Sequence, residues 1–254
     1  MKDGLPPTAC GTIGEWPLTR LLVYALDART SGRIVLTERV LVEHTIRLER
    51  GGITAVETPW AVPAIGRALV DLGVLDERLY RRTSETLGRD DDVYGEYLVS
   101  AGIVHLADLQ RARAEGTAKA ILRLTGALVE SAAFSMFTEP PVALHVPPID
   151  PLPLVWQAIS VRGLDGRLER GVDDLRGFAI ALHPRAPIGR FRFGPDESAA
   201  VAEIVRSPGR QSGASGANVS GLGREAWRRL LGVLLLTRSL YFGDEATLPV
   251  GVLA

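Results

Sequence analysis

Residues 31–58 constrain the fold more than any other stretch of this chain. Apolar and polar side chains alternate over residues 33–37 and again over 44–49, which is the period of a strand with one buried face. The sequence RGG at residues 50–52 is typical of a tight turn, and residues 53–56 predict a third strand after it. The stretch therefore predicts a small antiparallel sheet with one apolar face that other elements must cover.

The residues before the sheet predict a helix and a loose terminus. Over residues 18–28 the apolar side chains recur at the i, i+3, i+4 spacing of one helix face, so this helix is the nearest cover for the sheet. The residues up to Cys10 are polar and are interrupted by Pro6 and Pro7. We expect them to be disordered.

After the sheet the pattern changes to that of helices. Helix-start and helix-stop residues divide this part into short segments. The acidic run at residues 90–92 is expected to be a solvated loop that caps the helix after it. Helices are predicted over residues 63–72, 76–87 and 93–101, with one or two more over 105–125.

The helical part contains an internal repeat. IGRALVDLGVL at residues 65–75 aligns with YGEYLVSAGIV at residues 94–104, so each copy has a glycine after its first residue and a second glycine at its helix stop. Further along, Leu79 and Leu109 fall one residue out of step. Two copies are fewer than a solenoid needs, and we therefore predict a duplicated helical hairpin that packs on itself.

A further strand is predicted over residues 131–138, after the helices. An isolated strand needs a partner for its backbone groups, and the opening sheet is the available one. The sequence thus predicts an α+β fold in which a helical insert, residues 63–125, interrupts the sheet of a first domain, residues 11–140. A proline-rich stretch at residues 141–153 is expected to be an extended linker.

Residues 154–245 predict a second domain that is mixed but mainly helical, and a winged helix is one form that its end could take. A glycine- and serine-rich stretch at residues 209–223 is interpreted as a flexible connection rather than a phosphate-binding loop, because a helix precedes it and no lysine follows. Helices are predicted over residues 154–161, 197–206 and 224–241, a turn over 173–175, and strands over 178–182 and 188–193.

The composition limits the chemistry that this chain could carry. Its net charge of −1 gives no basic footprint for nucleic acid, and its longest apolar run is too short to cross a bilayer. The start of the chain has no apolar signal segment and Cys10 is the single cysteine, so we expect a cytoplasmic protein. The 4 histidines have no cysteine or acidic companion at a recognisable spacing. We therefore expect no metal site, no catalytic triad and no enzyme.

Four segments of the first domain carry a recognisable pattern. They are GTIGEWPLTRLL at residues 11–22, RTSGRIVL at 29–36, IRLERGGITAVE at 46–57 and AFSMF at 133–137. Together they resemble the PATAN domain, which is named for the N-terminus of the cyanobacterial regulator PatA. The resemblance implies a non-enzymatic module of bacterial signalling proteins that makes protein contacts, with response regulators or other signalling components as partners. It brings no catalytic residue and no cofactor.

The repeat carries a second, fainter resemblance. Its G-x-x-L-V-x-x-G pattern is similar to the N-terminal domain of secretion and pilus ATPases, some of which bind cyclic di-GMP through R-L-G-x-x-L motifs. Ala64 and Val93 stand where that motif has arginine, so the guanine and phosphate contacts of the arginine are missing. Cyclic-dinucleotide sensing is kept as an alternative function. The glycines that would contact the nucleotide are Gly66, Gly73, Gly95 and Gly102.

DNA binding by the second domain is the other alternative. Residues 185–229 hold eight arginines against four acidic residues, an excess too slight to count as a basic footprint. The function predicted first is therefore that of a cytoplasmic bacterial signalling or scaffold protein that works by protein–protein contact.

Overall fold

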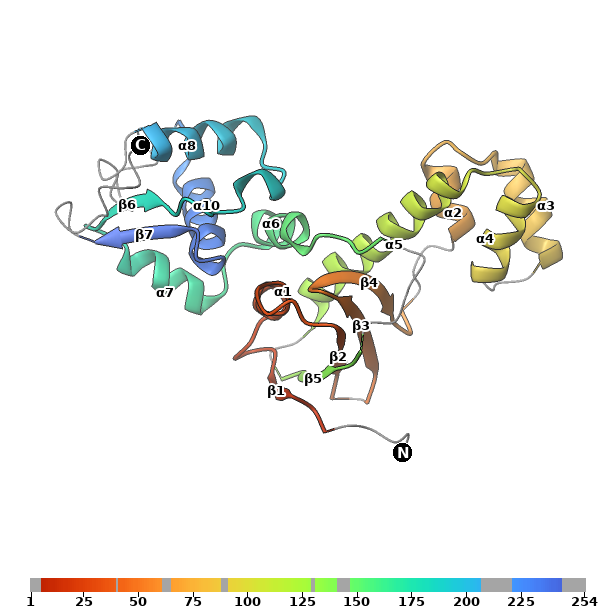
Figure 1. The fold of residues 1–254 in the computed structure, drawn as a ribbon, viewed down its shortest axis with the longest axis horizontal. Helices are drawn as coiled ribbons and strands as arrows, with labels where there is room; N and C mark the ends of the chain where they lie inside the picture. The colour runs from red at the N-terminus through yellow and green to blue at the C-terminus, as the bar shows by residue number, and fades with distance from the viewer. Residues whose placement is uncertain are drawn as a thin grey trace. The chain divides into compact units, whose positions relative to one another are not determined.

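A computed structural model describes residues 6–39, 41–60, 65–87, 91–128, 131–140, 147–206 and 221–243 (Figure 1). The chain divides into two compact units. One comprises Met1–Leu18 and Ala25–Ile149, and the other comprises Thr19–Tyr24 and Asp150–Ala254. Helices accompany an antiparallel sheet in the first unit and a smaller sheet in the second, which confirms the predicted α+β fold.

The sheet of the first unit has five antiparallel strands in the order β1-β5-β2-β3-β4. The predicted meander is confirmed, because β2 pairs with β3 and β3 with β4. The predicted return of the late strand is also confirmed: β5 pairs with β2, and Met136 lies opposite Ile34. The strands are β1 (Ala9–Thr12), β2 (Gly32–Thr37), β3 (Glu43–Glu49), β4 (Gly52–Glu57) and β5 (Ala133–Thr138).

The expectation of disorder up to Cys10 is wrong for the residues that the structure describes there. Cys10 lies in β1 opposite Ser135 of β5, and the amide of Thr8 donates to the carbonyl of Met136 at 2.8 Å. Without β1, strand β5 would be at the edge of the sheet and would leave a row of backbone groups without partners. The order of this segment thus comes from a strand far along the chain.

One face of the sheet forms the core of the first unit. The alternation read from the sequence gives this face its buried side chains, while the residues between them stay partly exposed. The helix α1 (Leu18–Asp27) is present as predicted. The largest fully buried apolar side chains of the strands are those of Ile34, Leu36, Ile46, Ile53 and Met136.

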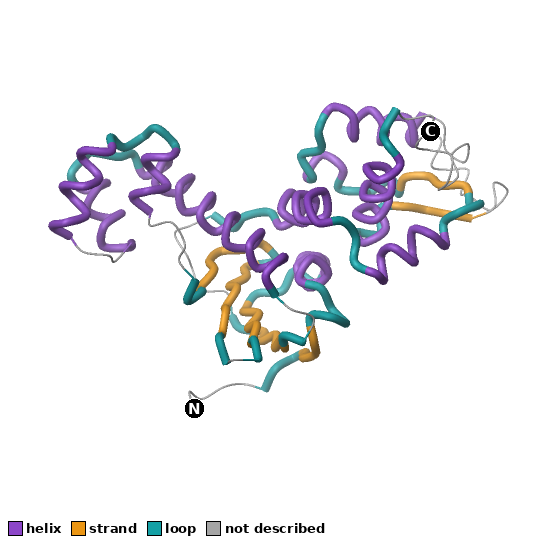
Figure 2. The backbone as a smooth tube through the Cα atoms, turned by 180° about the vertical axis from the view of Figure 1, so that it is seen from behind, coloured by secondary structure: helices purple, strands orange, loops and turns teal. Residues whose placement is uncertain are grey.

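The predicted helical insert follows β4, and Figure 2 shows a short loop between α2 and α3 and another between α4 and α5. The segment predicted as one or two helices over 105–125 is a single helix, α5, which contacts both α2 and β4. Asp91 lies inside α4, and its carboxylate accepts a hydrogen bond from the amide of Ile65 at 3.0 Å. Asp90 and the start of the predicted 63–72 helix lie outside the described residues. The helices are α2 (Ile65–Asp71), α3 (Glu77–Leu87), α4 (Asp91–Ser100) and α5 (Leu106–Ala127).

The end of the expected linker is structured. Ile149 exchanges two backbone hydrogen bonds with Ile53 of β4, at 2.7 and 2.9 Å. The expectation of extended chain to residue 153 is wrong, because α6 begins at Pro151. Asp150 accepts from the amide of Leu152, and proline is tolerated in a first turn, where its missing N–H has no helical partner. Residues 141–146 lie outside the described residues.

The second unit combines helices with a two-stranded sheet. Strand β6 is confirmed, and it pairs with β7, where Tyr241 lies opposite Ala181. In the described residues, α8 and α10 separate these strands along the chain, so the two strands do not form the hairpin of a winged helix. The elements are α6 (Pro151–Arg162), α7 (Gly166–Asp174), β6 (Ala179–Leu182), the 3₁₀ turn η1 (Ile188–Arg190), α8 (Pro195–Arg206), α10 (Arg224–Leu236) and β7 (Leu240–Gly243).

Three predictions for this unit are wrong. The predicted turn at 173–175 is the end of α7, a helix capped by Asp165, whose carboxylate accepts from two amides of the first turn. The predicted strand at 188–193 is η1 followed by the buried side chain of Phe191. The helix predicted to residue 241 ends at Leu236. Most of the loop at 209–223 lies outside the described residues.

Candidate functional site

The repeat in the sequence is a repeat in the structure. In the first copy, α2–α3, the amide of Val74 donates to the carbonyl of Leu69 at 2.9 Å. In the second copy, α4–α5, the amide of Ile103 donates to the carbonyl of Leu98, also at 2.9 Å. These bonds close the helix ends around glycines with φ of +70° and +68°, Gly73 and Gly102, where an L-residue would be strained.

The other two glycines let a second helix approach. A Cβ on Gly66 would lie 2.5 Å from the ring of Tyr80, and a Cβ on Gly95 would lie 2.9 Å from Leu109. Tyr80 and Leu109 therefore occupy equivalent positions on α3 and α5. The register that pairs Gly66 with Gly95 thus continues to Tyr80 and Leu109, so Leu79 and Leu109 are one residue out of step, as the sequence indicates.

The surroundings of the four glycines divide them into two pairs. Two lie under side chains of the neighbouring helix, and two lie at helix ends with no atom within 4 Å of an added Cβ. Helix packing and helix termination account for all of them. No observation on the described residues gives these glycines a further role in binding a nucleotide.

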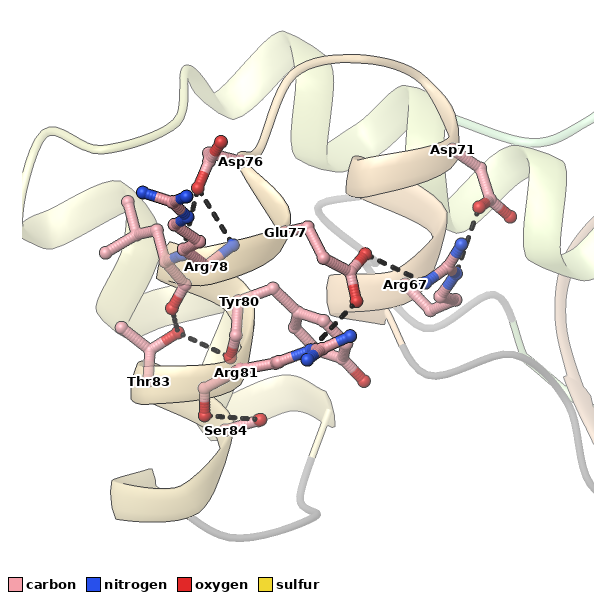
Figure 3. A network of polar contacts seen from close by, with 10 residues as sticks. Arg67, Asp71, Asp76, Glu77, Arg78, Tyr80, Arg81, Thr83 and Ser84 are labelled. Carbon is pink, nitrogen blue, oxygen red and sulfur yellow. Dashed lines mark hydrogen bonds and ion pairs between the residues drawn. The ribbon is translucent and has the colours of Figure 1, made fainter.

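The surface of the first copy carries a group of linked ion pairs (Figure 3). The guanidinium of Arg67 lies 3.1 Å from Asp71 and 2.9 Å from Glu77. The guanidinium of Arg81 lies 3.2 Å from the same Glu77. All these side chains are well exposed, so each pair contributes little to stability. Their charges nevertheless balance one another on this face.

The equivalent face of the second copy is different. Glu96 occupies the position of Arg67, and Leu106 occupies the position of Glu77. Leu106 is 56% exposed, and on α4 Val93 is 52% and Tyr97 is 40% exposed. Among the described residues no ion pair of Glu96 is found. We call the four residues Val93, Glu96, Tyr97 and Leu106 the α4 surface.

The two copies share an internal core beneath these surfaces. The hydroxyl of Thr83 on α3 donates to the carbonyl of Leu79 at 2.8 Å, and it lies 2.7 Å from the hydroxyl of Tyr94 on α4. With its own proton used, Thr83 accepts from Tyr94. Burial raises the pKa of the Tyr94 phenol, and the hydrogen bond to Thr83 offsets part of that rise. The insert is therefore a packed unit that can hold its surface residues in place.

A second polar cluster lies at one end of β2, β3 and β4, and no local sequence pattern indicates it. His44 of β3 is completely buried, with Nε2 at 2.8 Å from Glu38 and Nδ1 at 2.8 Å from Thr58. Its ring also contacts Trp60, over which the guanidinium of Arg123 from α5 lies at 4.9 Å. Glu38 is an acidic companion of His44 that no recognisable spacing in the sequence indicates. The β2–β3 register brings together two residues that the spacing did not connect.

The carboxylate of Glu38, the imidazole of His44 and the hydroxyl of Thr58 follow one another as in a catalytic triad. Their geometry is nevertheless that of a structural cluster. Both ring nitrogens of His44 are engaged, and its side chain has 0% exposure. The hydroxyl of Thr58 also accepts from the amide of Trp60 at 3.2 Å. A general base must reach the proton that it removes from a substrate, and this ring is enclosed. The cluster instead connects the sheet to α5.

In the ranges that the structure covers, no group of three or more His, Cys, Asp or Glu side chains could hold a metal ion. No helix in those ranges is long and apolar enough to cross a membrane. The chain matches no protein-family model, no curated protein and no solved structure.

Proposed function

We propose that this protein is a non-enzymatic adaptor of a bacterial signalling system, that it works in the cytoplasm by protein–protein contact, and that the α4 surface belongs to its contact area. The observation that carries the proposal is the exposure of Val93, Tyr97 and Leu106 on one copy of a duplicated hairpin. The other copy shows that the same scaffold can present a balanced, charged face instead.

The chemistry of these side chains supports a contact role. Single exposed apolar residues are ordinary, but Val93 and Tyr97 are one helical turn apart and lie on the same side of α4. Tyrosine is enriched at protein interfaces because it combines a large apolar ring with a polar tip. The resemblance of the first unit to the PATAN domain agrees with this role, and it makes response regulators or other signalling components the expected partners.

The test is affinity capture from an extract of the cells that make the protein. The full-length chain, the Tyr97→Ser/Leu106→Ser double variant and a Val161→Ser control are compared by quantitative mass spectrometry. Val161 is 75% exposed on α6, so its change removes a similar apolar group elsewhere. We expect a partner that the wild type and the control retain and the double variant loses. Equal retention by all three chains, or no specific partner for any, would contradict the proposal.

The two alternatives gain no support from the geometry. The glycines of the repeat are explained by helix packing and helix ends. Calorimetry that shows micromolar binding of cyclic di-GMP would be needed to reinstate nucleotide sensing. Retention on heparin at moderate salt would be needed to reinstate DNA binding.

A further inference from the structure

We infer that the α4 surface receives a short amphipathic helix of the partner protein, and that this helix carries an arginine or lysine beside its apolar stripe. This inference rests on the proposed function and deepens it. It names the chemistry of the partner, which the adaptor proposal alone leaves open.

The first copy shows which charges this scaffold balances. There Arg67 lies between the carboxylates of Asp71 and Glu77. In the second copy the position of that arginine holds Glu96, and the position of Glu77 holds the exposed Leu106. The same place therefore presents a carboxylate beside an apolar side chain, without the cation that the first copy supplies.

The charge of α4 points in the same direction. Glu96 is the charged residue of the α4 surface, because Asp91 accepts a hydrogen bond from the amide of Ile65 and the guanidinium of Arg113 on α5 lies near Gly95 instead. A guanidinium or ammonium group brought to Glu96 would form a charge-assisted hydrogen bond, and its stem could cover the neighbouring apolar groups. Basic residues on the partner would also accelerate its association through long-range attraction.

The spacing of the apolar residues fits a helix. Val93 and Tyr97 form a stripe one turn long on α4, and Leu106 stands at the start of the antiparallel neighbour α5. Glu96 lies at the margin of this stripe, three residues from Val93. A stripe of this kind receives the i, i+3, i+4 face of one amphipathic helix.

A second copy of this chain is a poorer occupant. A twofold contact between two α4 surfaces would place the acidic α4 helices against each other, and like charges at an interface disfavour such a pairing. The occupant is therefore a different, basic helix.

The test uses two fluorescein-labelled synthetic helical peptides about 18 residues long, one built from leucine and lysine and the other with glutamate at every lysine position. Their binding to the full chain is followed by fluorescence anisotropy. The expected result is that the basic peptide binds about tenfold more tightly than the acidic one. Glu96→Arg should weaken the basic peptide about tenfold, and Tyr97→Ser and Leu106→Ser should weaken it to a similar extent, while Val161→Ser should not.

Other outcomes overturn the inference. Equal binding of the two peptides would contradict a basic helix as the occupant. So would peptide binding that Glu96→Arg leaves unchanged, provided that the circular dichroism and thermal unfolding of this variant match the wild type. A dimer in sedimentation experiments that Tyr97→Ser abolishes would place a second copy on the α4 surface instead. The adaptor function survives these outcomes if the affinity capture finds a cellular partner that the wild type retains and the Tyr97→Ser/Leu106→Ser variant does not. If no partner is captured and no peptide binds, both proposals fall.

Discussion

The hydroxyl of Tyr94 lies 2.7 Å from the hydroxyl of Thr83, and this hydrogen bond joins the second copy of the helical hairpin to the first. Tyr94 is buried, and its ring also lies edge-to-face against Tyr80, with ring centroids 6.3 Å apart. The duplicated hairpins are thus fixed to each other by a polar contact within an otherwise apolar core.

Replacing Tyr94 by phenylalanine should destabilise the chain by about 1 kcal/mol, because Thr83 loses a donor that water cannot replace in the core. The measurement is the free energy of unfolding in urea. Tyr97→Phe is the matched control, since Tyr97 is 40% exposed on the same helix. Equal effects of the two changes would show that the buried hydrogen bond contributes nothing specific.

Replacing Gly66 by alanine should destabilise the chain by about 1–3 kcal/mol, because the new methyl group would overlap the rings of Tyr80 and Tyr94. Gly116 of α5 has no atom within 4 Å of an added Cβ, so Gly116→Ala should stabilise the helix by up to about 1 kcal/mol. Thermal and urea unfolding of the two variants measure these opposite signs. A stabilised Gly66→Ala variant would show that α3 and α4 do not approach α2 as closely as described.

Replacing His44 by leucine should cost about 1–3 kcal/mol, because Glu38 and Thr58 both lose the partner that their polar atoms bind. His105→Leu is the control: this histidine is exposed before α5, and its side chain makes no capping hydrogen bond. Urea unfolding should separate the two variants clearly. An unchanged free energy of unfolding for His44→Leu would mean that the cluster of Glu38, His44 and Thr58 does not stabilise the fold.

In the second unit, the stability should depend on the charge of Asp173. The hydrogen bond from Arg228 holds the pKa of the Asp173 carboxyl below its ordinary value. A carboxyl whose pKa is lower in the folded state contributes stability above its unfolded pKa, and this contribution disappears as the pH falls through the folded pKa. Asp173 is 41% exposed, so salt should weaken the effect.

The measurement is the melting temperature at low ionic strength. Between about pH 5 and pH 3 the wild type should lose more thermal stability than Asp173→Asn, which has no carboxyl at this position to protonate. Asp174→Asn, a change at the exposed neighbouring residue, should follow the wild type. Parallel melting curves for the wild type and Asp173→Asn would contradict the role of the Arg228 hydrogen bond.

Local patterns in the sequence predict the elements whose own residues determine them. Alternation and the turn at 50–52 predict the meander, and the paired glycines predict the duplicated hairpin. Strand β1 escapes prediction because its partner β5 lies far along the chain. The sequence does not predict the end of α10 at Leu236, because Arg238, with φ of +52°, stands where a glycine usually marks such a helix end.

The candidate site divides in the same way. The position of the repeat follows from Gly66 and Gly95, and the same register pairs Arg67 with Glu96. The ion pairs of Arg67 and the exposure of Leu106 appear only in the structure. The Glu38–His44 contact depends on the β2–β3 register, which sets which side chains meet across a strand pair. Long-range pairing of this kind leaves no local pattern to read.

The position of β5 between β1 and β2 has a consequence for synthesis on the ribosome. Strand β2 keeps an open edge, and β1 has no neighbour to pair with, until the whole of α2–α5 and then β5 have emerged. The helices depend on local contacts and can form early, whereas the closing of the sheet waits for a distant segment. A nascent chain stalled between the insert and β5 would therefore present an unpaired strand edge, with the duplicated hairpin folded before the sheet is complete.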